Sequence, residues 1–245
     1  LLANNSGNGN TAIGAAALNN NTTGYSNVAI GVGALSTNTK ANNLVAIGDS
    51  ALFNNANGST PGFILGVQNT AIGSKALFSN VFGGNNIALG LQALYSNNSG
   101  GSNVAIGVEA MYNNVAGANN TANGYRALYS STADQNTAMG FEAGYNTQNS
   151  YGTYIGFQAG RNTNGVSNTY LGWGAGTNAS VGTITTGANN ICIGVRSGQG
   201  ITGGGENITI GNLINTATLA LSNTITIGHN ISNSQNNSVV LGNGS

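Results

Sequence analysis

Short apolar segments alternate with longer polar segments along the whole chain, at a nearly constant interval. Each apolar segment belongs to a pentad that reads Asn, a β-branched residue, Ala, Ile or Leu, and Gly, as in residues 27–31. A short fixed period is typical of stacked coils rather than of a globular core, so the sequence predicts an all-β fold, a parallel β-roll or β-solenoid of about 14 coils. The pentad glycines, mostly 16 or 17 residues apart, are Gly14, Gly31, Gly48, Gly73, Gly90, Gly107, Gly124, Gly140, Gly156, Gly172, Gly194, Gly211, Gly228 and Gly242.

The second and fourth pentad residues share one face of the expected strand, because side chains alternate along a strand. Every second residue is β-branched, and every fourth residue is large and apolar except Asn123. β-branched side chains favour strands. The pattern therefore predicts one short strand in each coil, with the isoleucine row in the buried interior.

The third pentad residue points the other way along each strand. It is alanine in the first eight pentads, and it changes to Tyr154, Tyr170 and Cys192 in the next three. A continuous row of alanine on the outside of a coil suggests that this face is covered as well, since strands buried on both faces are apolar throughout. We expect another copy of the chain to lie against it.

A second apolar segment, Ala-Leu, begins three residues after the pentad glycine and loses its leucine from residue 144 onward. Because protein interiors stay filled, we expect an aromatic row to replace that volume. This row directly follows the pentad glycine, at Tyr125, Phe141, Phe157 and Trp173. The pentad asparagines lie one above another in stacked coils, which predicts an amide ladder.

The repeat predicts a single array over residues 1–245 rather than several domains. Residues 1–9 lead in, residues 10–211 hold the 16- or 17-residue repeats, and residues 212–245 hold the terminal repeats. Insertions lengthen two units, near residues 54–66 and 177–187. Insertions in solenoids become loops on one face, and these two are either binding loops or loops without a role.

Five basic and five acidic residues give the chain a net charge of zero, which disfavours nucleic acid and anionic membrane surfaces as partners. No apolar run approaches the ~18 residues of a membrane span, so we expect no membrane insertion by this segment. Cys192 is the only cysteine and is expected to be a buried apolar thiol. His229 is the only histidine. We therefore predict no catalytic residue, no metal site and no cofactor.

An aromatic row after the second segment is the candidate ligand-contact site, because tyrosine offers a sugar a flat apolar face and a polar tip. The alternative is that the row packs between chains or against adjacent turns. Its members occur once per coil and are expected to stack: Phe53, Phe78, Tyr95, Tyr112, Tyr129 and Tyr145.

The segments Asn-Val-Ala-Ile-Gly at 27–31 and 103–107 resemble the head repeat of trimeric autotransporter adhesins, the YadA-like heads. The last unit, from Gly228 to Gly242, spans 14 residues as that repeat does. The longer unit at 136–144 is similar to repeats in bacterial and phage tail-fibre-domain proteins. The resemblance implies a left-handed β-roll, a homotrimer and an extracellular location on a cell surface or a virion fibre. Most units here have 16 or 17 residues, so their turns are longer.

We therefore expect a non-enzymatic extracellular fibre segment, an adhesin head or tail-fibre shaft, that gives a rigid rod for multivalent attachment to a host-surface glycan or protein. One alternative is the repeating subunit of an extracellular filament. Another is an ice-binding β-solenoid, although Val and Ile interrupt its threonine row. A glycan-degrading enzyme would need a carboxylate pair, for which Glu109 and Glu142 are the candidates.

Overall fold

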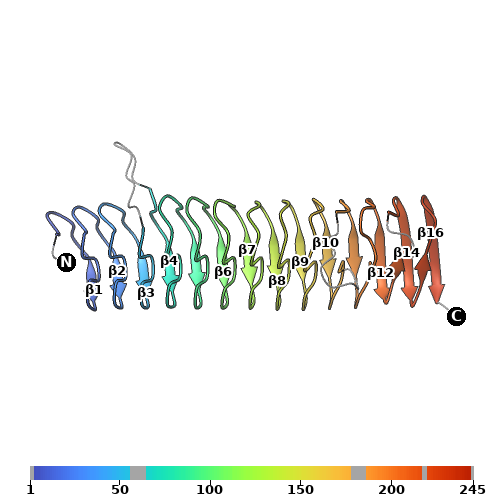
Figure 1. Cartoon of the computed structure of the whole chain (residues 1–245), viewed down its shortest axis with the longest axis horizontal. Coiled ribbons are helices and arrows are strands. Elements are labelled where there is room, and N and C mark those ends of the chain that lie inside the picture. The colour runs from blue at the N-terminus through green and yellow to red at the C-terminus, as the bar shows by residue number, and fades with distance from the viewer. Residues whose placement is uncertain (1–2, 56–64, 178–185, 217–219, 244–245) are drawn as a thin grey trace. The chain divides into compact units, whose positions relative to one another are not determined.

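The computed structural model describes residues 3–55, 65–177, 186–216 and 220–243, and within these ranges it contains strands and turns but no helix. The chain divides into two compact units, Leu1–Tyr125 (unit 1) and Arg126–Ser245 (unit 2). Each unit is a parallel β-solenoid, as the repeat predicts (Figure 1). The greater part of both predicted insertions, at 56–64 and 178–185, lies outside the described residues.

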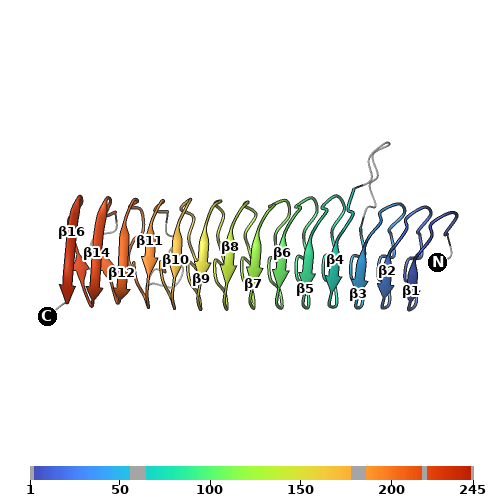
Figure 2. The same ribbon diagram turned by 180° about the vertical axis from the view of Figure 1, so that it is seen from behind.

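Unit 1 places one three-residue strand in each coil. Equivalent pentad residues face one another across neighbouring coils, because every strand pairs in parallel and in register with the next. Figure 2 shows these strands side by side in chain order. They are β1 (Thr11–Ile13), β2 (Val28–Ile30), β3 (Val45–Ile47), β4 (Thr70–Ile72), β5 (Ile87–Leu89), β6 (Val104–Ile106) and β7 (Thr121–Asn123).

Unit 2 continues the same parallel pairing within itself, and its last coils have longer strands and a second, two-stranded sheet. The longer strands include the pentad glycine and the residue after it, as in residues 224–229. The main sheet holds β8 (Thr137–Met139), β9 (Thr153–Ile155), β10 (Thr169–Leu171), β11 (Ile191–Ile193), β12 (Ile208–Asn212), β14 (Thr224–His229) and β16 (Ser238–Asn243). The second sheet pairs β13 (Asn215–Thr216) with β15 (Ser232–Asn233).

The two faces of the strands are the reverse of the prediction. The strand alanines from Ala29 onward are fully buried inside the coil, whereas the second and fourth pentad residues face outward. The reason is the narrow interior: each coil already buries the leucine of its second segment, such as Leu35. That leucine leaves room for only a methyl group opposite. The prediction that another copy covers the alanine row is therefore wrong.

In unit 2 the interior is filled differently. Tyr154 and Tyr170 replace the strand alanine and are buried, while glycine replaces the leucine of the second segment. A Cβ on Gly160 would lie 2.3 Å from the Tyr154 ring, and one on Gly176 would lie 2.3 Å from the Tyr170 ring. The strand tyrosines therefore fill the lost leucine volume. The expectation that the row at Tyr125, Phe141, Phe157 and Trp173 fills it is wrong, because those side chains are 38–43% exposed.

The pentad glycine is needed because neighbouring coils approach each other closely there. A Cβ on Gly31 would lie 2.3 Å from the carbonyl oxygen of Gly48, and the φ of Gly31 is 136°. No side chain fits this contact, and an L-residue is strained at that φ. The recurrence of glycine in the pentad thus follows from the stacking of the coils.

Two columns of buried asparagine connect the coils. In the pentad column, the Asn103 backbone N–H donates to Asn86 Oδ1 (2.9 Å), and Asn103 Nδ2 donates to Asn86 Oδ1 at 3.1 Å. The predicted amide ladder is confirmed there. A second ladder, which the sequence analysis did not anticipate, runs through unit 1: Asn97 Nδ2 donates to Asn80 Oδ1 at 2.8 Å. In the equivalent column, unit 2 has Ser131, Thr147 and Thr163.

Candidate functional surfaces

The outward rows of second and fourth pentad residues, here called the outer sheet face, form an extended apolar surface in each unit. In unit 1, Ile13, Ile87 and Leu89 are 43–59% exposed. In unit 2, Met139, Leu171, Val239 and Leu241 are 43–68% exposed. Because the strands pair in register, these side chains form continuous rows. Extended exposed apolar patches in soluble proteins mark interaction sites.

The chemistry of the outer sheet face is uniform. No pentad has a charged residue in its second or fourth position, and the polar members are threonines and Asn123. In unit 2, Thr137, Thr153 and Thr169 follow one another in register on β8, β9 and β10. An uncharged partner would therefore meet apolar side chains on this face, with hydroxyl groups among them at regular spacing.

The predicted aromatic row is a stacked ladder within each unit. In unit 1, the ring centroids of Phe53 and Phe78, Phe78 and Tyr95, and Tyr95 and Tyr112 are 5.4, 5.2 and 4.9 Å apart, with planes within 12° of parallel. In unit 2, Tyr129 and Tyr145 are 5.0 Å apart and 2° from parallel. The expectation of stacking is confirmed.

The ladder presents ring edges rather than ring faces to a ligand. Each stacked ring covers a face of its neighbour, and in unit 2 guanidinium groups cover more: Arg126 lies 5.3 Å from the Tyr129 centroid, and Arg161 lies 5.2 Å from that of Tyr145. All six rings are half-buried. A bound sugar would meet their edges and the phenolic oxygens.

The carboxylate of Glu142 is held by neighbouring side chains. Arg161 Nε donates to Glu142 Oε2 at 2.7 Å, and Gln158 Nε2 donates to the same oxygen at 2.9 Å. A buried carboxylate that is paired in this way orients the arginine over Tyr145. Its contacts therefore assign Glu142 to the packing of this coil.

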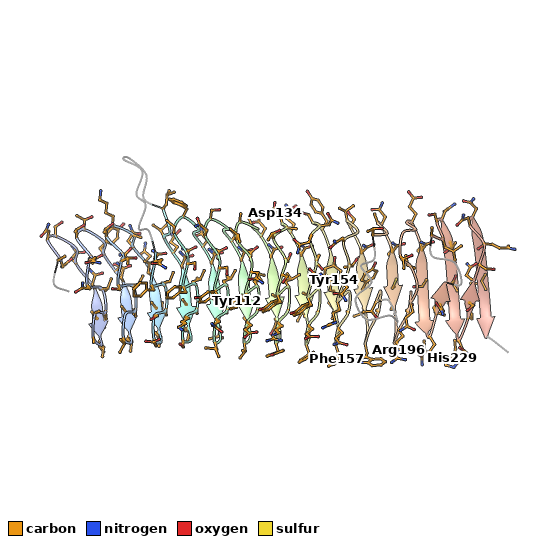
Figure 3. All side chains as sticks on the ribbon, in the orientation of Figure 1. Tyr112, Asp134, Tyr154, Phe157, Arg196 and His229 are labelled. Atoms are coloured by element: carbon orange, nitrogen blue, oxygen red, sulfur yellow. The ribbon has the colours of Figure 1, made fainter. Side chains whose placement is uncertain are left out.

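A second aromatic row lies at the carboxyl ends of the unit 2 strands, and sequence reasoning placed it inside. Phe141 and Phe157 stack with centroids 5.0 Å apart, and the guanidinium of Arg196 lies 4.4 Å from the Trp173 centroid. Figure 3 shows Phe157, Arg196 and His229 along this edge of unit 2, with Asp134 at the opposite edge and Tyr154 between them. Together with the outer sheet face, this row widens the apolar surface of unit 2.

Cys192 is fully buried, as predicted, and burial raises the pKa of its thiol to about 12. Burial also raises the pKa of Tyr154 to about 12, against a smaller lowering by the hydroxyl of Thr147. The pKa of Tyr170 is raised well above its usual value by burial and, to a lesser extent, by Cys192 and Tyr154. These groups stay neutral at physiological pH.

Few features of the described residues suggest a small-molecule site. A shallow groove in unit 2 is lined by Thr186, Asn189, Glu206 and Ser222, beside the described end of the second insertion. Among the residues that the structure describes, no three His, Cys, Asp or Glu side chains gather as metal ligands would. Nor does any helix there have the length and apolar character to cross a membrane.

Comparisons of the chain with protein-family models, with curated proteins and with solved structures find no match.

Proposed function

We propose that this chain is a structural and adhesive segment of an extracellular fibre, in which copies of the chain associate through the outer sheet face. The observation that carries the proposal is the in-register apolar surface of that face, with Leu89 43% exposed in unit 1 and Leu171 43% exposed in unit 2. Association would remove this surface from water.

The energetics favour self-association over exposure. Covering a half-exposed Ile, Leu or Val contributes on the order of 1 kcal/mol, and the face repeats such a residue in nearly every pentad. No charge opposes the desolvation, because none occupies these positions. A second copy has the same spacing between coils, so its apolar rows match those of the first from coil to coil.

The resemblance to YadA-like heads and tail-fibre proteins supports a more specific form of this proposal. In that form the fibre contains three copies of the chain, the coil is left-handed, and the fibre lies on a cell surface or a virion. In that arrangement the outer sheet faces meet at the centre of the trimer. Turns and ring edges of the aromatic ladder, at Phe53, Phe78, Tyr95, Tyr112, Tyr129 and Tyr145, then face a host-surface glycan or protein. Their repetition supports weak multivalent contact rather than catalysis.

The test is the mass of the purified chain in solution, measured by light scattering. We expect three chain masses for the native sequence, and a single chain mass with an unchanged circular dichroism spectrum for the double variant Ile87→Lys and Leu89→Lys. Ser99→Lys, which adds a charge at an exposed turn of the same unit, is the matched control and stays trimeric. A monodisperse monomer of the native chain contradicts the proposal.

Ice binding is the second candidate function, and the position of the threonine row in the structure supports it. The threonine row lies on the outer sheet face instead of the interior, and Thr137, Thr153 and Thr169 repeat in register. Such a face could order water at a fixed spacing. Thermal hysteresis that is present in a monomeric native chain, and lost in Thr153→Lys, supports this candidate over the fibre.

A further inference from the structure

The proposed function uses the ring edges of the aromatic ladder, but it does not use the stacking of two tyrosine pairs in that ladder. Tyr95 and Tyr112 in unit 1 have ring centroids 4.9 Å apart and planes 6° from parallel. Tyr129 and Tyr145 in unit 2 are 5.0 Å apart and 2° from parallel. All four rings are half-buried, so part of each stays in contact with solvent. Each pair joins two neighbouring coils through equivalent positions.

This arrangement suits one reaction of phenols. When a tyrosine loses one electron and its hydroxyl proton, the unpaired electron spreads to the ring carbons beside the hydroxyl-bearing carbon. Two such radicals form a carbon–carbon bond between these ring positions. The encounter is normally slow because radicals are dilute, and holding the two partners together raises their effective concentration greatly.

We propose that Tyr95–Tyr112 and Tyr129–Tyr145 are sites of oxidative dityrosine cross-linking, which joins adjacent coils of one chain covalently. The oxidant is hydrogen peroxide used by a peroxidase. Two phenols give up two electrons and two hydroxyl protons, and peroxide takes these up to form two water molecules. After the carbon–carbon bond forms, each ring moves a proton from carbon to oxygen and recovers its phenol. The product is one dityrosine for each peroxide.

The surroundings of Tyr112 fit a reaction that starts from the neutral phenol. Burial, with smaller contributions from Tyr95 and Glu109, raises the pKa of Tyr112 above its usual value. The hydroxyl therefore keeps its proton near neutral pH, and that proton leaves together with the electron.

Other aromatic pairs are poorer substrates for the same reaction. Phe53 and Phe78 stack but have no hydroxyl group. Tyr154 and Tyr170 are 5.8 Å apart, tilted by 48° and enclosed in the coil interior. Tyr25 and Tyr151 are 45% and 62% exposed, so an oxidant reaches them more readily than the ladder. They are matched controls for reactivity that depends on exposure alone.

The experiment treats the folded chain with peroxidase and hydrogen peroxide. We expect dityrosine fluorescence, a mass lower by two hydrogen atoms for each link, and peptide maps that join Tyr95 to Tyr112 or Tyr129 to Tyr145. On a denaturing gel the product keeps the mobility of one chain. Products linked only between chains overturn the proposal, as does a folded native chain that yields no dityrosine.

Paired variants separate stacking from exposure. Tyr112→Phe combined with Tyr129→Phe keeps an aromatic ring at every position of the ladder, but it leaves no adjacent pair of phenols within the ladder. We expect at least a tenfold loss of intrachain dityrosine from this variant, and a native yield from Tyr25→Phe combined with Tyr151→Phe. The opposite ranking overturns the proposal. Because the reaction lies within one chain, its outcome is independent of whether copies associate or bind ice.

Discussion

Unit 1 and the Tyr154–Tyr170 region of unit 2 build the same coil with opposite distributions of volume. In unit 1 the strand contributes a methyl group and the second segment contributes leucine, as in Ala88 and Leu94. In unit 2 the strand contributes tyrosine and the second segment contributes glycine, as in Tyr154 and Gly160. The comparison shows that either position can supply the large side chain of the interior, and in the coil of Ala138 and Gly144 the neighbouring Leu128 and Tyr154 side chains supply it.

The exchange also changes backbone strain. Leu35, Leu52, Leu77 and Leu94 have φ between 49° and 52°, a left-handed conformation that costs an L-residue about 1–2 kcal/mol. At the equivalent position, Gly160 has φ 59° without that penalty. Unit 1 therefore accepts strain in the second segment to fill its core from there, whereas the tyrosine coils avoid the strain and bury a phenol instead.

Removing the tyrosine ring has the largest expected effect. Tyr154→Ala leaves a cavity against Gly160, because glycine has no side chain to refill it, and we expect a loss of about 3–5 kcal/mol in the free energy of unfolding. Urea denaturation measures the loss, and hydrogen exchange locates it in the coils around β9. Tyr151→Ala, a change at an exposed tyrosine nearby, is the control and should stay within about 0.5 kcal/mol of the native chain. Equal losses in the two variants contradict the volume argument.

Moving tyrosine into the leucine core should lower the free energy of unfolding by about 3 kcal/mol, which is the upper end of the range for overpacked cores. Ala88→Tyr in unit 1 places the ring against Leu94 of its own coil and Leu77 of the preceding one. In unit 2 the Tyr154 ring lies against Gly144 and Gly160, which hold those two places. Adding Leu77→Gly and Leu94→Gly to Ala88→Tyr should therefore recover much of the stability. If the triple variant is less stable than Ala88→Tyr alone, the two coil types do not interchange.

Alkaline pH should destabilise the coils that bury a tyrosine, because the phenol ionises more readily in the unfolded chain than in the folded one. The folded pKa of Tyr154 is about 12, above its ordinary 10.0, so the folded chain holds this proton more tightly than the unfolded chain. Its contribution to stability is present below pH 10 and falls as pH rises from 10 to 12, by about 1.4 kcal/mol at pH 11. Urea denaturation at pH 8 and pH 11 measures this fall. Tyr154→Phe should lose less stability between the two values than the native chain, and an identical loss contradicts the assignment.

The sequence predicted the period, the strands and their register, because β-branched residues and glycine recur at fixed intervals. It also predicted that the Phe53–Tyr112 rings stack. It could not assign the inside of the coil, because alternation shows only that Ala29 and Ile30 face opposite ways, and both residues are apolar. The deciding fact is spatial: the second segment buries its leucine opposite the strand. In the coil of Tyr154 the second segment has Gly160 instead, so the tyrosine ring fills the interior, while Trp173 lies on the outside of its own coil.

The smallest expected effect concerns the buried polar column of each unit, which holds asparagine in unit 1 and hydroxyl residues in unit 2. Asn97 in unit 1 donates to Asn80 Oδ1 at 2.8 Å and to the carbonyl oxygen of Gly100 at 2.9 Å. Ser131 Oγ in unit 2 is buried and makes no hydrogen bond within the described residues. Ser131→Ala should therefore change the free energy of unfolding by less than about 0.5 kcal/mol or raise it slightly, because it removes an unsatisfied group.

Asn97→Ala is the matched change in unit 1. It should lower the free energy of unfolding by about 1–3 kcal/mol, because it leaves the amide oxygen of Asn80 without this donor. Both values come from urea denaturation of the single variants. A cost for Ser131→Ala as large as that for Asn97→Ala would mean that the hydroxyl column of unit 2 binds buried water. The hydroxyls would then stabilise their coils through water as the asparagine ladder does directly.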